Sequence, residues 1–249
     1  MKKIIYCLII ISSVVANHYV HAQEYIEPYN HLLSHYVSEG EKDNIRTTLI
    51  DYDAWGEDPL HHQAIKKLQG VSISNLQGAK KMAFWINAYN LLTIDLIVKT
   101  GETDSIKNQG SFWKNVWKSH SWMIDGTNYT LDQIEHKILR PMADPRIHMA
   151  INCASLSCPD LLNEAYQAEK LDWQLTNQVK NFLGNDSKGV KLVSDYIYVS
   201  KIFDWFKEDF GGYEGIRAFV NQYKNIDVDH LSIRYMKYNW DLNGVDISE

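Results

Sequence analysis

Residues 84–98 constrain the fold more than any other part of this sequence. They read FWINAYNLLTIDLIV and are apolar or aromatic except for two asparagines, a threonine and an aspartate. The pattern predicts a long helix over residues 75–99, with Ser74 or Asn75 as its N-cap and Thr100-Gly101 as its end. A helix that is apolar on nearly every side is normally buried. We therefore expect this helix at the centre of the protein.

Two asparagines in a buried helix need hydrogen-bond partners. Asn87, Asn90 and Thr93 follow one another at intervals of three residues and share one helix face. An unpaired buried amide costs about 1–3 kcal/mol, so both asparagines must be satisfied. Either they tie the helix to neighbouring backbone, or Asn87 or Asn90 lines a cleft and orients a catalytic group or a substrate carbonyl.

The rest of the chain predicts an α+β fold: a single helix-rich domain with a small antiparallel sheet built from hairpins. Helical patterns occupy residues 25–37, 131–140, 171–183, 202–207 and 213–223. Hairpins are predicted over 121–130 and 190–199, and further strands over 147–151 and in the tail 231–243. The order has no βαβ rhythm, and the chain has no repeat and no linker. We expect one domain over residues 23–249.

Residues 1–22 have the three parts of a secretory signal peptide. Lys2 and Lys3 precede an apolar run over residues 4–16, and Ala22 is a small residue suited to a cleavage point. The run is shorter than the roughly 20 residues of a membrane span, so we expect no stable span after cleavage. The mature protein is expected to be soluble and exported, either periplasmic or extracellular.

Charge narrows the class of partner. Loss of Lys2 and Lys3 lowers the count of basic residues from 25 to 23, against 31 acidic residues, which gives the mature chain a net charge of −8. Such a chain is a poor candidate for binding phosphate backbones, so we expect no nucleic-acid partner. A small molecule or an envelope protein is the expected partner.

The second unusual stretch is DPRIHMAINCASLSCP, residues 144–159, which holds His148, Asn152, Cys153 and Cys158. Two cysteines in an exported protein suggest a disulfide. The bridge requires Cα atoms about 4.4–6.8 Å apart, so the chain would have to fold back between the cysteines. The alternative is a thiol nucleophile, Cys153, with His148 as its base and an asparagine orienting the imidazole. If residues 147–152 form a strand, His148 and Cys153 point to opposite faces, so that pairing requires the strand to end near Ile151.

Other polar groups give weaker signals. The Cys-x4-Cys spacing is not a zinc pattern, and His61-His62 is interpreted as a solvated pair, so we expect neither metal nor cofactor. Glu135 and Arg140 lie in the predicted helix 131–140, where the alternatives are ordinary surface ion pairing and a buried Glu135–Arg140 link to the cleft. Asp209 and its charged neighbours in KIFDWFKEDFGGY, residues 201–213, are interpreted as a solvent-facing side.

Six stretches together resemble the family catalogued as domain of unknown function 547, in its exported bacterial form. They are DYDAW (51–55), AFWINAYNLLTI (83–94), IEHKILRP (134–141), DPRIHMAINCASLSCPDL (144–161), SKIFDWFKEDF (200–210) and YNWDLN (238–243). The resemblance implies no particular activity. The family pattern carries over to Asn87, Asn90, Glu135, Arg140, His148, Asn152, Cys153, Cys158 and Pro159. Plant relatives with the same cysteine pair imply a reducing compartment, which favours a packed or reactive thiol over a purely structural disulfide.

These observations lead to two hypotheses about one cleft. In the first, the protein is a thiol-dependent hydrolase or acyl transferase of the cell envelope, with Cys153, His148 and the asparagines 87, 90 and 152 in catalysis. Glu135, Arg140 and Cys158 would then contact the catalytic residues rather than the substrate. In the second, the cysteine pair is structural and the same polar patch binds a ligand or a protein without catalysis.

The first testable prediction concerns the N-terminus. We expect cleavage after Ala22, because the small residue there follows an apolar run of signal-peptide length. N-terminal sequencing of the exported protein checks this, with Gln23 as the expected first residue. An intact Met1 on the exported protein would contradict it.

Overall fold

The expected central helix is present. The computed structural model describes residues 24–110 and 115–246, so the predicted signal peptide lies outside it. Helix α5, Gly78–Thr100, is buried from Met82 to Ile97. It starts later than predicted, after Gln77, and neither Ser74 nor Asn75 caps it. It ends as predicted at Gly101, whose left-handed φ of 62° is typical of a helix C-terminus.

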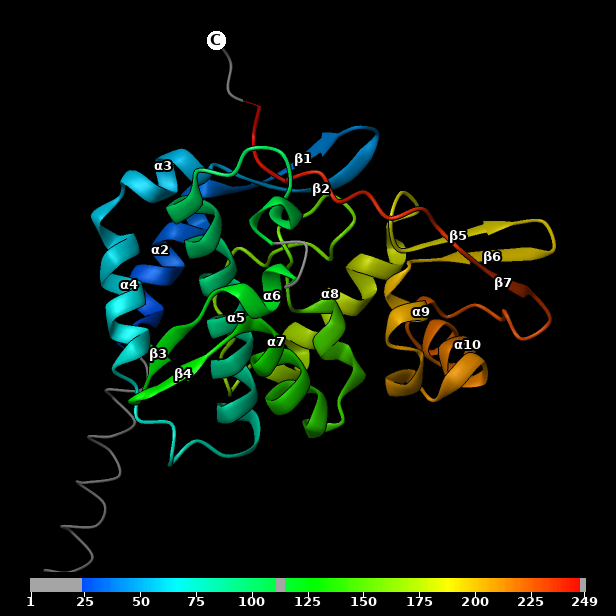
Figure 1. Cartoon of the computed structure of the whole chain (residues 1–249). Helices are drawn as coiled ribbons and strands as arrows, with labels where there is room; N and C mark the ends of the chain where they lie inside the picture. Colours follow the sequence, from blue (N-terminus) through cyan, green and yellow to red (C-terminus); the bar gives the residue numbers. More distant parts are fainter. Residues whose placement is uncertain (1–23, 111–114, 247–249) are drawn as a thin grey trace, which may run out of the picture.

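In Figure 1 the helices of the N-terminal part lie to the left of α5, and a hairpin from the same part lies at the top of the view. They are α2 (Ile26–Tyr36), β1 (Val37–Lys42), β2 (Ile45–Ile50), α3 (Tyr52–Glu57) and α4 (Pro59–Gln69). Helix α2 matches the prediction, but no hairpin was expected from the sequence where β1 and β2 lie. The turn residues Asp43 and Asn44 have positive φ angles of 53° and 60°, which suits a tight hairpin turn.

A buried polar cluster joins α4, α5 and the next hairpin. The solvated role expected for His61 is wrong, because its ring is buried and its Nε2 lies 3.0 Å from Asp95 Oδ1 on α5. The other ring nitrogen accepts a hydrogen bond from Trp55 Nε1 at 3.0 Å. Trp122 Nε1 donates to Asp95 Oδ2 at 2.6 Å. Every polar atom named here has a partner, so the cluster is a structural tie.

The middle of the chain alternates short elements. These are η1 (Ile106–Gln109), α6 (Val116–Ser119), β3 (Trp122–Ile124), β4 (Thr127–Tyr129), α7 (Leu131–Gln133), the π-helix η2 (Ile134–Leu139) and the 3₁₀ turn η3 (Arg140–Met142). The predicted hairpin around Asp125-Gly126 is therefore present. The predicted helix over 131–140 is also present, but it widens from α to π geometry after Gln133.

The strand predicted over 147–151 is wrong. Residues Pro145–Met149 form a 3₁₀ helix, η4, in which Asp144 accepts a hydrogen bond from the backbone N–H of Arg146. Proline at the first helical position and an aspartate cap are helix-start signals. A short apolar run such as IHMAI fits a buried helical turn as well as a strand, so periodicity alone does not separate them.

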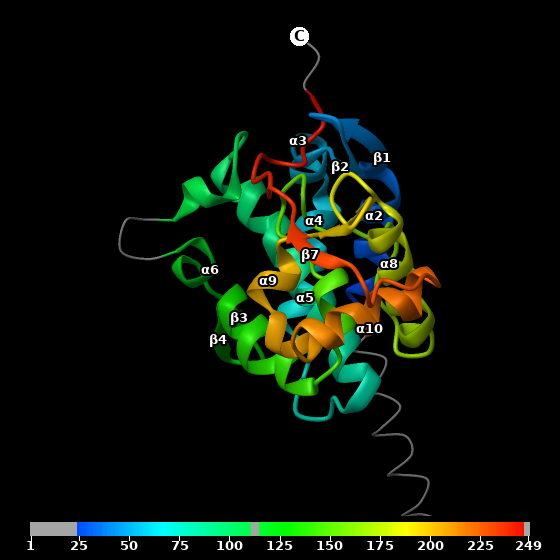
Figure 2. The same ribbon diagram turned by 90° about the vertical axis from the view of Figure 1, so that its right-hand side faces the viewer.

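The C-terminal part forms its own hydrophobic cluster and faces the viewer in Figure 2. Its elements are α8 (Leu171–Gly184), β5 (Val190–Val193), β6 (Tyr196–Val199), α9 (Ile202–Trp205), η5 (Lys207–Phe210), α10 (Gly212–Lys224) and β7 (Ser232–Tyr235). The predicted β5–β6 hairpin is present, and β7 joins it in parallel. The class is α+β, as predicted, with small sheets built mainly from antiparallel hairpins.

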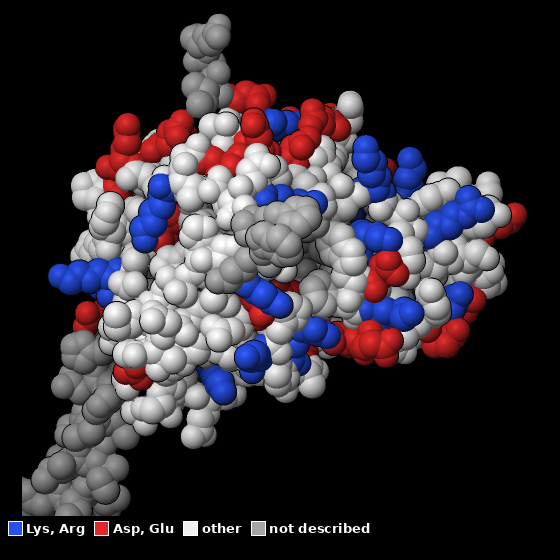
Figure 3. Space-filling view, viewed as in Figure 1, with Lys and Arg blue, Asp and Glu red and all other residues white. Residues whose placement is uncertain are grey.

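The chain after β7 returns to the N-terminal hairpin and to the segment that follows η4. Gly244 pairs with Ile50 beside β2, and Leu242 pairs with Ser155. Among the described residues, no helix is both long and apolar enough to cross a membrane. Figure 3 shows Lys and Arg interspersed with Asp and Glu on one face, rather than gathered into a basic stripe.

The two asparagines of α5 are hydrogen-bonded to the chain. Asn87 Nδ2 donates to the carbonyl of Tyr166 at 2.8 Å, and its Oδ1 accepts from the N–H of the same residue at 2.8 Å. Asn90 Nδ2 donates to the carbonyl of Ala150 at 2.9 Å, and its Oδ1 accepts from the N–H of Asn152 at 2.8 Å. Each amide thus serves as a substitute backbone partner for a neighbouring segment.

We predict that Asn90→Ala destabilises the protein by about 2–4 kcal/mol. The substitution leaves a buried carbonyl and a buried N–H unpaired, and each such group costs about 1–3 kcal/mol. Urea denaturation measures the change. The matched control is Asn128→Ala on β4, an exposed asparagine for which we expect a change within about 0.5 kcal/mol. Equal effects of the two substitutions would contradict the prediction.

Candidate functional site

A cavity of about 310 Å³ lies where α5, η2, η4, α9 and the segment after β7 meet. Its lining includes Tyr89, Trp117, Glu135, His136, His148, Cys153, Cys158, Trp205, Phe206, Tyr238 and Trp240. A larger hollow of about 640 Å³, between the β1–β2 hairpin and α8, is lined mainly by polar side chains and contains no cysteine, histidine or aromatic residue. The smaller cavity is therefore the candidate site for chemistry.

Asn152 folds the cysteine loop. Its Nδ2 donates to the carbonyl of Pro159 at 2.8 Å, and its Oδ1 accepts from the N–H of Ala154 at 2.8 Å. Ala154 has a positive φ of 56°, so the chain reverses direction there. The reversal brings the two cysteines together, with the backbone N–H of Cys153 donating to Cys158 Sγ at 2.8 Å. Both cysteines are free thiols in the structure.

The two thiols have different environments. Cys153 is half-buried, and its Sγ lies 3.1 Å from Ser155 Oγ and 3.2 Å from the Tyr238 hydroxyl. Burial alone would raise the pKa of the Cys153 thiol, but hydrogen bonds with Cys158, Ser155 and Tyr238 outweigh it and lower the pKa to about 7. Cys158 is buried, and burial raises the pKa of its thiol. Cys153 is thus the reactive member of the pair.

Glu135 extends from the π-helix η2 into the same cavity. π-Helical turns are frequent at functional sites, because the extra residue in the turn redirects a side chain. The Tyr89 hydroxyl donates to Glu135 Oε2 at 3.4 Å and accepts from Trp117 Nε1 at 3.1 Å. Burial, together with the negative charge that Cys153 can carry, raises the pKa of Glu135 to about 8. At neutral pH this carboxyl group is mostly protonated.

His148 is bound on one side and unpartnered on the other. Its Nε2 lies 2.8 Å from Asp209 Oδ2, and its ring stacks on Phe206 with the ring centroids 4.0 Å apart. A carboxylate only accepts, so we assign the proton to Nε2. The buried Nδ1 has no hydrogen-bond partner. Burial lowers the pKa of His148 to about 4 despite the nearby carboxylate, so the imidazole is neutral at pH 7.

The Asp209 carboxylate accepts hydrogen bonds from two candidate residues, Arg140 and His148. Arg140 binds it through Nε at 2.6 Å and Nη2 at 2.7 Å. A third guanidinium nitrogen, Nη1, lies 2.9 Å from His136 Nδ1. Burial would raise the pKa of Asp209, but the hydrogen bonds from Arg140 and His148 outweigh it and lower the pKa. The solvent-facing role predicted for Asp209 is therefore wrong.

The structure brings together only some of the residues proposed from the sequence. Cys153, Cys158, His148 and Glu135 line the cavity. Arg140 does not line it, but contacts the lining residues His136 and Phe206 and binds Asp209. Asn87, Asn90 and Asn152 are bound to backbone and do not line it. Within residues 24–110 and 115–246, no hydrogen bond joins the His148 ring to either sulfur, and no group of three His, Cys, Asp or Glu side chains could hold a metal ion.

Sequence reasoning missed Asp209, Ser155 and Tyr238. Asp209 lies among other charged residues, where nothing in the pattern distinguishes it. Tyr238 belongs to the YNWDLN stretch, whose residues received no functional role from the sequence. The signal that could have found it is the density of aromatic residues there, since Trp240 lines the same cavity.

We predict that Glu135→Gln makes stability less sensitive to alkaline pH. The folded protein holds the Glu135 proton up to about pH 8, while an unfolded glutamate loses it near pH 4.3. The folded state therefore binds more protons between these values, and wild-type stability falls there as pH rises, by on the order of 1 kcal/mol per pH unit. Urea denaturation at pH 5 and pH 9 should show the variant gaining over wild type with pH. The exposed Glu208→Gln is the control, and a pH-independent difference at Glu135 would contradict the prediction.

Comparison with known proteins gives a family match for the middle part of the chain. No curated protein and no solved structure matches it. The family model described as "Protein of unknown function, DUF547" matches residues 73–183. This range holds α5, Glu135, His148 and both cysteines of the cavity, but it ends before Asp209 and Tyr238. Residues 73–183 thus match the DUF547 family, to which six stretches of the sequence show a resemblance.

Proposed function

We propose that this cavity carries out thiol-dependent hydrolysis or acyl transfer in the cell envelope, after export of the chain. The observation that carries the proposal is the Cys153 thiol, which opens to the cavity with its pKa lowered to about 7 by hydrogen bonds that outweigh its burial. At neutral pH about half of this thiol is thiolate, so it needs no separate base before it attacks. The expected signal peptide supports the envelope location.

Glu135 suits the proton transfers of such a reaction. The Cys153 thiolate would attack a substrate carbonyl, and the protonated Glu135 would give its proton to the leaving group. The Glu135 carboxylate left behind would then take a proton from the water or acceptor that releases the acyl group. A pKa of about 8 lies close enough to neutral pH to serve in both directions.

His148 takes a different role from the one expected from the sequence. An imidazole with a pKa of about 4 is a weak base at neutral pH, and its ring bonds to Asp209 instead of a sulfur. Its neutral ring, stacked on Phe206, can present the Nδ1 lone pair to a donor on the substrate. In this account Asp209 orients His148, the role that the sequence hypothesis gave to an asparagine.

The lining favours an uncharged acyl group as the substrate. Trp117, Trp205, Phe206, Tyr238 and Trp240 supply aromatic surface, and Glu135 and His148 are mostly neutral at pH 7. A cavity of about 310 Å³ matches a small-molecule group rather than a protein surface. A thioester, ester or amide with an apolar or aromatic acyl part meets these conditions.

The test is the pH dependence of the thiol combined with trapping of an acyl-enzyme. Iodoacetamide should label Cys153 with a rate that rises to a plateau around a midpoint near pH 7. Incubation with p-nitrophenyl butyrate should add one butyryl group to the peptide that contains Cys153. Cys153→Ala should abolish both signals. Glu135→Gln should keep the labelling but slow acyl release by about 10²-fold or more. Glu208→Gln serves as the control, and labelling with an ordinary thiol midpoint and no adduct would overturn the proposal.

A non-catalytic binding module is the second candidate. Its support is the aromatic wall itself, in which Trp205 and Trp240 stack with centroids 5.5 Å apart and Tyr238 lies 4.6 Å from Trp240. In that case the Cys153 thiol stays hydrogen-bonded to the Tyr238 hydroxyl and to Ser155 and does not react. The cavity then binds a ligand without chemistry. A ligand whose affinity is unchanged by Cys153→Ala, in a protein that forms no adduct, would favour this candidate.

A further inference from the structure

The cysteine loop, residues 153–158, folds back so that its two ends are in contact. The backbone N–H of Cys153 donates to Cys158 Sγ at 2.8 Å, so the Cys158 sulfur lies directly beside residue 153. Asn152 spans the loop, since it bonds to Ala154 on one side and to Pro159 on the other. The chain reversal that a disulfide between positions 153 and 158 requires is therefore present while both thiols are free.

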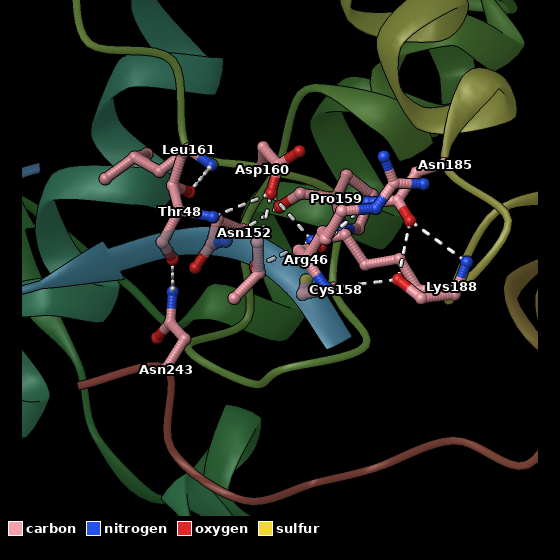
Figure 4. A network of polar contacts seen from close by, with 12 residues as sticks. Arg46, Thr48, Asn152, Cys158, Pro159, Asp160, Leu161, Asn185, Lys188 and Asn243 are labelled. Atoms are coloured by element: carbon pink, nitrogen blue, oxygen red, sulfur yellow. Dashed lines mark hydrogen bonds and ion pairs between the residues drawn. The ribbon is translucent and has the colours of Figure 1, made fainter. Parts of the chain in front are cut away.

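The Cys158 end of the loop is anchored from outside. Asp160, two residues further on, accepts hydrogen bonds from Lys188 Nζ at 2.7 Å and from the N–H of Thr48 at 2.9 Å (Figure 4). Lys188 is itself fully buried, and its ammonium also donates to Thr47 Oγ1 at 2.7 Å. This network fixes the segment after Cys158 against β2. A bond between the sulfurs would then form by movement of the Cys153 side chain.

The Cys153 side chain is the accessible one. It lines the cavity and is held by two weak sulfur–hydroxyl contacts, to Ser155 at 3.1 Å and to Tyr238 at 3.2 Å. Cys158 also borders the cavity, but its side chain is only 3% exposed. An oxidant entering the cavity therefore meets Cys153 first, with Cys158 in position to react next. An exposed reactive thiol beside a second cysteine is the usual arrangement of a reversible redox site.

We propose that Cys153 is a site of reversible oxidation by a hydroperoxide, with Cys158 as the resolving cysteine. The Cys153 thiolate attacks the peroxide O–O bond, takes one oxygen to become a sulfenic acid, and releases hydroxide, which becomes water on protonation. The Cys158 sulfur then attacks the Cys153 sulfur, and the sulfenic hydroxyl leaves with the thiol proton as a second water. Two thiols and one hydrogen peroxide thus give one disulfide and two waters.

The consequence for activity rests on the proposed function of Cys153 as a nucleophile. A disulfide removes the thiolate and leaves the rest of the cavity in place, so oxidation switches the site off. It also protects Cys153 from further oxidation, which reduction cannot reverse. A purely structural disulfide differs, since it would persist in the functional form of the protein.

The experiment follows one tryptic peptide of the full chain. Trypsin cleaves after Arg146 and Lys170, so a single peptide, residues 147–170, contains Cys153 and Cys158 and excludes Cys7. After one equivalent of hydrogen peroxide, we expect this peptide to be lighter by two hydrogens and to resist iodoacetamide. Dithiothreitol should restore both the mass and the labelling.

Variants separate the two cysteines. Cys158→Ser should stop at the sulfenic acid, which dimedone traps at Cys153, and Cys153→Ser should leave Cys158 unoxidised under the same treatment. Ser157→Ala, which changes the loop but keeps both sulfurs, is the matched control and should still form the disulfide. The mass of the peptide reports the disulfide without any need for activity. A protein that forms the disulfide but no acyl-enzyme would therefore support this proposal and contradict only the proposed activity.

Two results would overturn the proposal. One is a wild-type peptide that gains oxygen atoms without forming the disulfide, since Cys158 would then not resolve the sulfenic acid. The other is a disulfide between two chains in place of the one within the peptide, visible as a dimer on non-reducing electrophoresis. Either result with an intact acyl-enzyme would leave the proposed function standing.

Discussion

The hydrogen bonds between the Asn90 carboxamide and the backbone at Ala150 and Asn152 are the interaction on which the site depends. They fix the position along α5 at which the chain enters the cysteine loop. Asn152 then uses its own side chain to close that loop. Two amides in series therefore set where Cys153 lies relative to the central helix. Neither amide lines the cavity, yet both determine its geometry.

The cavity gathers ionisable groups in forms that carry little charge. Burial favours the protonated form of Glu135 and the neutral form of His148. The full charges lie one layer further out, where Arg140 and Asp209 bind each other through two hydrogen bonds. A thiolate at Cys153, stabilised by hydroxyl and thiol donors, then faces the cavity together with the Asp132 carboxylate. Aromatic side chains line the cavity around it, and an apolar environment strengthens such hydrogen bonds.

Much of the fold could be predicted because burial and turn chemistry are local properties of sequence. The central helix, its glycine end and both predicted hairpins follow from apolar runs and turn residues such as Asp125-Gly126. The site was less accessible to such reasoning. The partners of Arg140 and Cys153 are Asp209 and Tyr238, which lie far away in sequence and come close only through packing. The amides of Asn87 and Asn90 illustrate the converse, because burial predicts that they need partners but does not say which.

Tyr238 reaches Cys153 from a segment that lies 85 residues further along the chain, after β7. The same segment pairs with Ser155 through Leu242 and with Ile50 through Gly244. A chain in which this segment has not yet docked lacks the Tyr238 hydroxyl, one of the three hydrogen-bond partners that lower the pKa of Cys153. The full acidity of this sulfur therefore reports that the segment after β7 is in place.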